Sequence, residues 1–432
     1  MKSFLKNIIV WILQAEALLV IRKYRPKIVA ITGSVGKTST KDAIFTVLSN
    51  FFFVRKSEKS FNSEIGVPLT ILGLPNGWDS PFIWAKNIVR GLALILLPNH
   101  YPKWLVLEIG ADRPGDIKKI TTWIIPDIAV LTTLGRVPVH VEFFPSIESL
   151  IEEKSNLAKA LTSNGVLVLN SDDENTLSLR DLVYTKPICY GFGENAAIRS
   201  THYAIWYDEV DGKPRGINFK VGWENSIVPI HLSGVVGVQH VYPILAALAV
   251  AVSQGLNMVL ASGALENFSP PRGRMNLLEG KNSSLIIDDS YNSSPIAAEE
   301  ALKTLGEIRA TRGRKIAVLG DMMELGRYSS EEHRKLGSKV SEVCEALVTV
   351  GIRARFIAEG ALKKKMAKRS IYIFDTTEEA AEFLKDFVQA DDIILVKGSQ
   401  SVRLERAVLG IMAHPERRKE FLIRQEDEWQ RR

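Results

Sequence analysis

The stretch KIVAITGSVGKTST, residues 27–40, decides how the first half of this chain is interpreted. Lys27–Thr32 is a short apolar run rich in β-branched residues, which is typical of a buried parallel strand. A tight glycine loop follows, and Thr38–Ser49 has a helical pattern. A strand, a glycine loop and a helix in this order present backbone N–H groups and a helix N-terminus to phosphate oxygens. We therefore expect a nucleoside triphosphate site at Gly33, Ser34, Val35, Gly36, Lys37, Thr38 and Ser39.

Two side chains of this loop have the chemistry that a phosphate site needs. Lys37 is placed to reach the β- and γ-phosphates, and the Thr38 hydroxyl is placed to bind Mg²⁺. The general phosphate-loop pattern has a glycine where this chain has Ile31, so the loop is a variant. Such loops occur in GTPases, kinases, motors and ligases, so the loop alone does not predict a reaction.

Working outward from the loop, strand-like runs recur at 104–109, 128–132 and 166–170, and a helical pattern lies at 146–161. Alternating strands and helices predict an α/β fold with a mostly parallel sheet. From about residue 198 to residue 231, short alternating segments with turn residues predict an antiparallel β excursion.

The sequence SPPRG at 269–273 predicts a hinge, because two prolines stop the preceding helix and a glycine frees the chain. A second series of strands and helices follows and predicts a doubly wound, Rossmann-like unit. We expect three parts: an apolar helix at 1–26, an ATP-binding domain at 27–269 and a C-terminal domain at 270–432.

Composition sets the limits of these interpretations. The chain has 432 residues, 46% hydrophobic and 24% charged, with two cysteines and a net charge of +6. These values are ordinary for a globular protein and exclude a disulfide framework or a Cys-rich zinc site. The small positive excess suits anionic ligands or a membrane surface, and it is too diffuse to predict nucleic-acid binding. We expect a cytoplasmic monomer.

Two segments, 4–21 and 82–97, are strongly apolar. The first is expected to be a helix packed on its own protein. A helix lying on the membrane surface, with Arg22, Lys23 and Arg25 beside it, is the alternative. A membrane span is disfavoured, because it would place Glu16 in hydrocarbon at a cost of roughly 2.5–3.5 kcal/mol.

Three further residues follow predicted strands or lie on a predicted helix. Glu108 ends a strand, at the edge where ligands of parallel sheets bind. His140 follows the next strand, and Lys154 lies in a charged helical run. Taken singly, Glu108 is equally consistent with a surface carboxylate. Taken singly, His140 is more typical of a loop or core histidine than of a ligand, and a helical lysine in a charged run is normally solvated.

As an ordered set, GxxGKTS, then EIGA at 108–111, then HVE at 140–142, then the helical Lys154 resembles the Mur ligase family of ATP-dependent amide ligases. The resemblance implies two Mg²⁺ ions, with Thr38 at the first ion and with Glu108 and His140 binding the second. It also implies that Lys154 is carbamylated, which turns a cation into the oxygen ligand that Mg²⁺ requires.

The second half carries more of the family's motifs. They are RGRM at 272–275, DDSYNSSP at 288–295, LGDMMELG at 319–326 with His333, and VKGSQS at 396–401. The resemblance implies that Arg274 contacts the ATP phosphates and that Asp289, Tyr291 and Asn292 belong to the nucleotide site. His240 stands where the family has an asparagine that contacts adenine. The candidate residues for the amine substrate are Asp321, Glu324, Lys397 and Ser399.

The last three motifs are similar to those of family members that add D-alanyl-D-alanine to a UDP-muramoyl-tripeptide in peptidoglycan synthesis. That reaction implies an acyl-phosphate intermediate and catalytic roles for Lys37, His140, Lys154 and Arg274. Only about thirty residues precede Gly33, too few for the uridine-binding domain that such ligases carry. A related ligase for another carboxylate and amine, or an inactive ATP-binding scaffold, are the alternatives. A GTPase is disfavoured, because no NKxD-type motif follows the strands.

Overall fold

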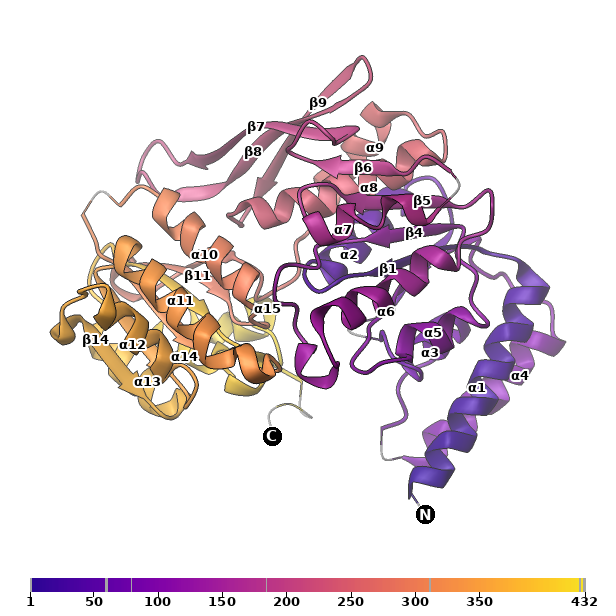
Figure 1. Ribbon diagram of the computed structural model, residues 1–432, viewed down its shortest axis with the longest axis horizontal. Helices are drawn as coiled ribbons and strands as arrows, with labels where there is room; N and C mark the ends of the chain where they lie inside the picture. Colours follow the sequence, from indigo (N-terminus) through magenta and orange to yellow (C-terminus); the bar gives the residue numbers. More distant parts are fainter. Residues whose placement is uncertain are drawn as a thin grey trace.

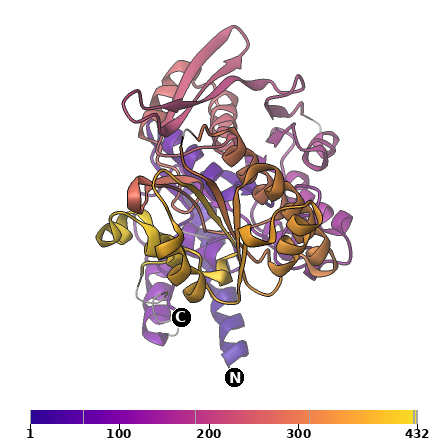
Figure 2. The ribbon, with the colours of Figure 1, turned by 90° about the vertical axis from the view of Figure 1, so that its left-hand side faces the viewer.

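Two sheets lie side by side in the computed structural model, which describes residues 2–58, 61–78, 80–183, 185–310, 312–426 and 429 (Figure 1). The first sheet is built by the N-terminal half of the chain and the second by the C-terminal half. Figure 2 shows the second sheet facing the viewer, with the strands of the antiparallel excursion above it. The predicted α/β fold, with parallel sheets and an antiparallel excursion, is confirmed.

The first sheet has nine strands in the order β2-β3-β1-β4-β5-β6-β7-β8-β9. The pairs from β2 to β7 are parallel, and the β7–β8 and β8–β9 pairs are antiparallel. The strands are β1 (Lys27–Thr32), β2 (Val54–Lys56), β3 (Trp104–Glu108), β4 (Ile128–Leu131), β5 (Val166–Asn170), β6 (Ile188–Gly191), β7 (Ile198–Tyr207), β8 (Pro214–Trp223) and β9 (Ser226–Ser233).

Helices cover both faces of this sheet, which explains why its central strands are apolar throughout rather than alternating. Val29 and Ile31 of β1 face one core, with α2, α8 and α9, whereas Ile28 and Ala30 face the other, with α1, α3, α5 and α6. The helices are α1 (Lys2–Tyr24), α2 (Lys37–Ser49), α3 (Gly66–Leu72), α4 (Pro81–Leu96), α5 (Asp116–Thr121), α6 (Ile147–Lys159), α7 (Glu174–Leu177), α8 (Val241–Ser253) and α9 (Met258–Ala264).

The second sheet has six strands in the order β10-β11-β15-β12-β13-β14, and all its pairs are parallel except β10–β11. Helices α10, α11 and α12 pack on one face, and α13 and α14 pack on the other. Its elements are β10 (Asn276–Glu279), β11 (Leu285–Asp289), β12 (Lys315–Gly320), β13 (Ala346–Val350), β14 (Ile371–Phe374), β15 (Ile393–Lys397), α10 (Pro295–Glu307), α11 (Ser329–Val343), α12 (Arg355–Lys363), α13 (Thr377–Phe387), α14 (Glu405–Ile411) and α15 (Arg418–Phe421).

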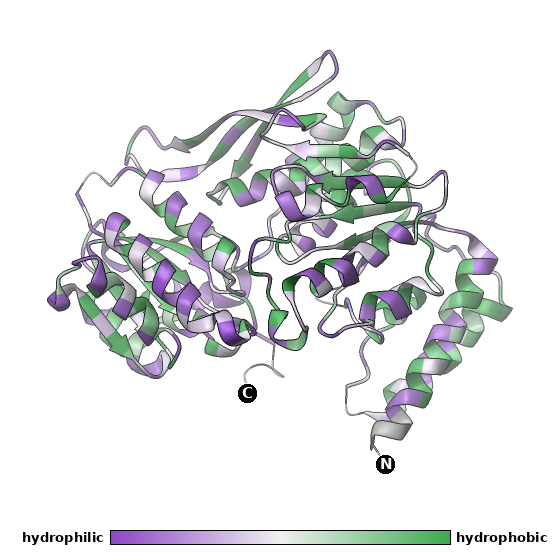
Figure 3. Cartoon of the chain, in the orientation of Figure 1, coloured by the Kyte–Doolittle hydropathy of each residue, from purple (hydrophilic) through white to green (hydrophobic). Residues whose placement is uncertain are grey.

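Helices α1 and α4 form a pair at the end of the molecule away from the second sheet (Figures 1 and 3). The C-terminal ends of the two helices lie together. The Lys23 ammonium near the end of α1 donates to the carbonyl oxygens of Leu94, Ile95 and Leu97 at the end of α4. Within the described residues, no helix is both long enough and apolar enough to cross a membrane.

The contact between α1 and α4 is made by a carboxyl group and a glycine. Glu16 is 4% exposed, and a Cβ on Gly91 would lie 2.1 Å from its Oε2 atom. Asn87, one turn before Gly91, is also buried, whereas Leu92 is 46% exposed. The side of α4 that carries Asn87 and Gly91 therefore packs against α1, because only a residue without a side chain leaves room for Glu16.

Burial raises the pKa of Glu16 to about 7, and neither of its carboxyl oxygens has a hydrogen-bond partner among the described residues. The folded chain therefore binds a proton that the unfolded chain releases between pH 4.5 and pH 7, so this group lowers stability as pH rises through that interval. We predict that Glu16→Gln raises the free energy of unfolding at pH 8 by on the order of 1 kcal/mol and changes it little at pH 5.

Denaturant unfolding at both pH values measures this difference. Glu194→Gln, at an exposed glutamate, is the control and should change stability at neither pH. An equal effect of Glu16→Gln at pH 5 and pH 8 would contradict the buried, proton-binding carboxyl.

Candidate functional site

The glycine loop joins β1 to α2 and passes close to β4. Gly33 has a φ of +149°, and a Cβ there would lie 1.9 Å from Thr132 Oγ1, so no other residue fits without displacement. Gly36 has a φ of +86° and precedes the first residue of α2. The amide of Ser34 donates to Thr133 O at 2.9 Å. These contacts fix the loop over the carboxyl ends of β1 and β4, where the sequence predicted it.

Two lysine side chains meet at one carbonyl oxygen of this loop. Lys37 Nζ lies 2.8 Å from Gly33 O, and Lys154 Nζ lies 3.0 Å from the same atom. Among the described residues, neither amine has a carboxylate within ion-pair distance. Burial lowers the pKa of both lysines, and Lys37 lowers the pKa of Lys154 further. The pair therefore lacks a counter-ion and is suited to receive an anion.

Lys154 is 1% exposed, although a solvated lysine was one interpretation of its charged run. The preceding Glu153 is buried as well, and its carboxylate accepts from the amides of Gly115, Ile117 and Lys118 at the start of α5. Helix α6 is thus turned so that Glu153, Lys154 and Ser155 face the protein, and Lys154 is held beneath the glycine loop.

Oxygen-bearing side chains gather beside the lysines. Glu108, at the end of β3, accepts from the Thr38 hydroxyl at 3.0 Å and from Asn62 Nδ2 at 3.3 Å. Lys41 Nζ lies 3.9 Å from the same carboxylate. The predicted pair Thr38 and Glu108 is therefore assembled, and Asn62 is a neighbour that the sequence analysis missed because it lies on a separate loop.

His140 was predicted to bind metal and Glu324 to bind substrate, and the structure brings these two side chains together. His140 Nδ1 lies 2.7 Å from Glu324 Oε2, and Asp112 lies 3.8 Å from the other ring nitrogen. The contact with His140 lowers the pKa of Glu324. Both residues have positive φ, 69° and 63°. This contact joins the loop after β4 to the loop after β12.

No group of three or more His, Cys, Asp and Glu side chains in the described ranges is arranged to hold a metal ion. Glu108 and His140 nevertheless line the same cavity, of about 180 Å³, together with Ser34–Thr38, Asp112, Tyr291 and Asn292. The second metal site therefore stays a prediction.

The hinge supplies a third cation. Arg274 lines the cavity of Glu108 and its guanidinium lies 4.2 Å from the ring centre of Tyr291. Gly273, with a φ of +66°, accepts from the Tyr291 amide at 3.1 Å. The predicted hinge is thus in direct contact with the 288–295 segment, which carries Tyr291.

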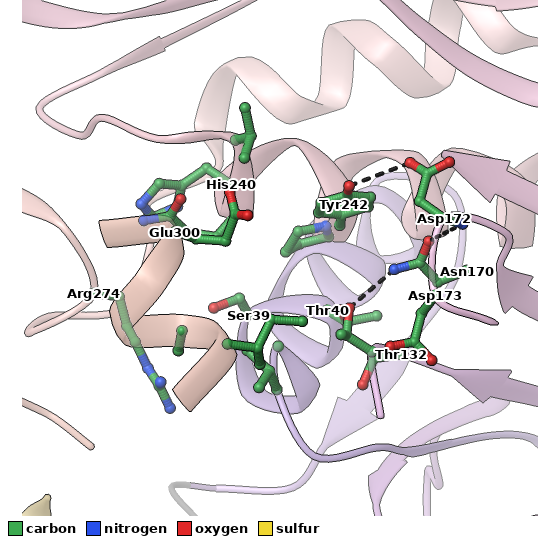
Figure 4. A pocket seen from close by; sticks show the side chains of 18 of the residues that line it. Ser39, Thr40, Thr132, Asn170, Asp172, Asp173, His240, Tyr242, Arg274 and Glu300 are labelled. Carbon is green, nitrogen blue, oxygen red and sulfur yellow. Dashed lines mark hydrogen bonds between the residues drawn. The ribbon is translucent and has the colours of Figure 1, made fainter. Parts of the chain in front are cut away.

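A second cavity, of about 200 Å³, lies on the other side of the glycine loop and of Arg274 (Figure 4). Asn170 and Asp172 form its wall at the end of β5, and Tyr242 Oη donates to Asp172 at 3.2 Å. Ser39, His240, Asp289 and Glu300 also line it. Its mixed aromatic and polar wall is suited to a nucleoside.

His240 lies in this cavity as a neutral base. Burial lowers the pKa of its ring to about 4, and it is 2% exposed. Its Nε2 atom has no hydrogen-bond partner among the described residues. The residue that replaces the family's asparagine therefore offers one unpartnered ring nitrogen.

The remaining C-terminal candidates mostly hold loops. Lys397 is buried, lines the second cavity and donates to Asp289 Oδ2 at 2.6 Å. Asp321 Oδ1 accepts from the Ala354 amide at 2.7 Å, and Ser399 Oγ accepts from the Met323 amide at 2.9 Å. Asp321 and Ser399 line neither cavity, so their substrate roles stay predictions.

One residue that the sequence analysis missed is Arg424, in the tail after α15. It is 6% exposed, donates to the carbonyl oxygens of Tyr291 at 2.6 Å and of Ser290 at 3.4 Å, and pairs with Glu405 at 3.1 Å. No motif in the sequence marks this residue. Arg424 positions the loop that carries Tyr291 and Asn292.

Comparison with known families identifies both halves of the chain. The Mur ligase middle domain matches residues 87–251, and the Mur ligase glutamate ligase domain matches residues 273–400. The two matches together span more than half of the chain.

The chain belongs to the Mur ligase family.

Curated relatives of this Mur ligase include the UDP-N-acetylmuramoyl-tripeptide–D-alanyl-D-alanine ligases of Bacillus subtilis and Rickettsia prowazekii. The first is 29% identical, with 93% of this chain and 79% of the relative covered, and the second is 26% identical, with 92% and 80% covered. Among solved structures, the MurF ligase of Thermotoga maritima in complex with ADP is 28% identical, with a TM-score of 0.74 and 95% and 84% of the two chains covered.

We predict that Arg424→Gln loosens the 290–292 loop of this Mur ligase and weakens ATP binding by roughly tenfold, because a buried side chain that organises two carbonyl groups is lost. Glu405 keeps Arg403 as a partner at 2.5 Å, so the fold should persist. Amide exchange at residues 290–292 and ATP titration measure the two effects. Arg418→Gln, at an exposed arginine in α15, is the matched control. Unchanged exchange in Arg424→Gln would refute the positioning role.

Proposed function

We propose that this Mur ligase adds D-alanyl-D-alanine to a UDP-N-acetylmuramoyl-tripeptide, using ATP and releasing ADP and phosphate. The observation that carries the proposal is the pair of lysines at Gly33 O, which has no carboxylate within ion-pair distance in the described ranges and lies at a crevice that both halves of the chain line. The functions of its relatives in Bacillus subtilis and Rickettsia prowazekii support the choice of substrates.

ATP would lie across the glycine loop. Adenosine fits the cavity of Tyr242 and Asn170, where the unpartnered Nε2 atom of neutral His240 can accept a hydrogen bond from the amino group of adenine. Asp289 lines the same cavity, and we propose that it faces the ribose. The triphosphate would pass over Gly36 and α2 to Lys37 and Arg274, whose charges offset those of the phosphates.

The donor set beside the lysines fits Mg²⁺. The Thr38 hydroxyl, a Glu108 oxygen and the Asn62 amide group converge in the cavity, and Mg²⁺ prefers oxygen ligands. We propose two ions, the first at Thr38 and the second at Glu108, His140 and carbamylated Lys154. When bound, the ions would neutralise the charge between two anionic reactants.

The environment of Lys154 favours the carbamate. Because burial and Lys37 lower its pKa, its amine is more often neutral than that of an exposed lysine. A neutral amine attacks the carbon of CO₂, an N–C bond forms, one C=O bond opens and the nitrogen releases a proton. The resulting carbamate is an anion beside the Lys37 ammonium. It replaces the repulsion between two lysine cations with an attraction.

The reaction then needs two displacements. The tripeptide carboxylate attacks the γ-phosphorus, and the bond from that phosphorus to the bridging oxygen of ADP breaks. The amine of D-alanyl-D-alanine attacks the acyl carbon, loses a proton and expels phosphate. Lys37 and Arg274 place the first two anions together, and the hinge at 269–273 lets the C-terminal domain close over the acyl phosphate and exclude water.

Three further features complete the proposal. Cys189 and Cys344 are free thiols, as expected in the cytoplasm, where ATP is available. One chain supplies both sides of the crevice, which supports a monomer. Peripheral membrane contact belongs to the proposal as well, because α1 exposes Trp11 at 69%.

The substrates are tested by phosphate release from ATP and Mg²⁺, with D-alanyl-D-alanine and the UDP-muramoyl-tripeptide each left out in turn. We expect release only when both are present, with a pentapeptide product. Release with another carboxylate, and none with the UDP-substrate, would overturn this choice of acceptor.

We predict that Lys154→Ala lowers turnover by roughly 10²–10³-fold, because the carbamate that holds charge in the transition state is lost. NMR of the chain equilibrated with ¹³C-bicarbonate should show a carbamate signal that Lys154→Ala removes. Lys159→Ala, at an exposed lysine on the same helix, should keep both the signal and the turnover. A signal that persists in Lys154→Ala would refute the assignment.

A further inference from the structure

One end of the molecule carries a local excess of positive charge. Residues 1–26 and 81–103 hold 8 of the 55 Lys and Arg residues but 1 of the 49 Asp and Glu residues. The combined charge of these two segments is therefore +7. They form α1, α4 and the residues that follow them, and they lie together at the end opposite the second sheet (Figure 1).

The one acidic residue of these segments is turned inward. Glu16 is 4% exposed and packs against Gly91 of α4, so its carboxyl group is removed from the surface. The outer side of the helix pair therefore presents basic and uncharged side chains. Lys6 does have an exposed partner, Glu64, at 3.3 Å, whereas no ion pair is found for Lys86 or Arg90 among the described residues.

The same end of the molecule exposes large apolar side chains. On α4, Phe82 is 78% exposed, Val89 65% and Leu96 76%. Residues seven apart differ in direction by about 20° around a helix, so these three form one stripe along α4. Lys86 and Arg90 lie at the edge of the stripe, about 40° and 80° from Phe82.

Helix α1 adds a second exposed stripe. Trp11 is 69% exposed, Leu19 46% and Ile8 39%, and Arg22 lies on the same side at the end of the helix. Nine of the twenty exposed large hydrophobic side chains in the described part of the chain lie on α1, on α4 or beside α4. Figure 3 shows the hydrophobic colouring running along both helices.

We propose that the outer side of α1 and α4 docks on an anionic lipid bilayer, with the α4 stripe inserted among the acyl chains and Lys86 and Arg90 at the headgroups. A helix with an apolar stripe and basic edges lies in the interface of a membrane rather than across it. The charge of the helix pair complements anionic headgroups. This inference specifies the surface and the lipid of the membrane contact proposed above and does not depend on the ligase reaction.

The position of the surface leaves the catalytic crevice open. The glycine loop and both cavities lie between the two sheets, whereas α4 lies beyond α1 and α3 on the far side of the first sheet (Figure 1). A docked chain would therefore hold its crevice toward the aqueous phase.

Flotation of the full chain with vesicles tests the proposal. We expect the chain to float with vesicles that contain phosphatidylglycerol. Its affinity for vesicles of pure phosphatidylcholine should be lower by roughly tenfold or more. The double variant Phe82→Ser/Val89→Ser should lose binding to both. Lys86→Glu/Arg90→Glu should lose the preference for phosphatidylglycerol, and added salt should weaken the parent chain in the same way.

The matched control is Val210→Ser/Ile352→Ser, which removes two side chains that are 97% and 74% exposed elsewhere on the molecule. It should float like the parent chain. Absence of flotation, or unchanged flotation of Phe82→Ser/Val89→Ser, would overturn the proposal. A different outcome is that the parent chain does not float and forms dimers in solution, and that Phe82→Ser/Val89→Ser abolishes these dimers. That outcome would overturn the membrane proposal and show that a second copy of the chain covers this surface. Phosphate release without vesicles should be the same for all these variants, so failure of the docking proposal is distinct from failure of the ligase proposal.

Discussion

The carbonyl oxygen of Gly33 accepts hydrogen bonds from two amines that belong to distant parts of the chain, and much of the structure serves to hold this arrangement. Lys37 begins α2, while Lys154 is carried under the loop by the buried face of α6. Gly33 can approach both because it has no side chain that would meet Thr132. Two cations of lowered pKa without a carboxylate are unfavourable unless an anion joins them. In the proposed enzyme, the carbamate on Lys154 and the phosphates of ATP would supply this negative charge.

Two sets of contacts join the second half of the chain to the site of Lys37 and Lys154. Arg274 comes from the hinge and lines both cavities, and its loop is held by Tyr291 and, through the tail, by Arg424. His140 and Glu324 make the other connection, between loops that follow strands of different sheets. Because the crevice is formed by both halves, the distance between them controls whether a phosphate and an attacking group can meet. Slow steps of such enzymes are often these closures rather than the chemistry.

Local patterns were sufficient to predict much of this fold. The strand, loop and helix beginning at residue 27 were predictable because each is determined by neighbouring residues, and β5 has the bounds that its apolar run indicated. The short β2 and the edge strand β10 carry too few apolar residues to stand out. The His140–Glu324 contact, the burial of Glu16 against Gly91 and the reach of Arg424 to Tyr291 depend on residues far apart in sequence, so no local pattern contains them. The same reason explains why Asp321 and Ser399, both in a family motif, hold loops: the motif marked the loop but not the direction of each side chain.

The glycine loop and Lys37 are proposed to bind a polyphosphate. The most direct measurement compares the affinities of ATP and adenosine for the full chain by calorimetry, with the parent sequence and with Lys37→Met. Charge-assisted hydrogen bonds to phosphate should make ATP bind at least ~100-fold more tightly than adenosine, and Lys37→Met should remove most of that difference while adenosine binding stays the same. Equal affinities of the parent chain for ATP and adenosine would contradict the account.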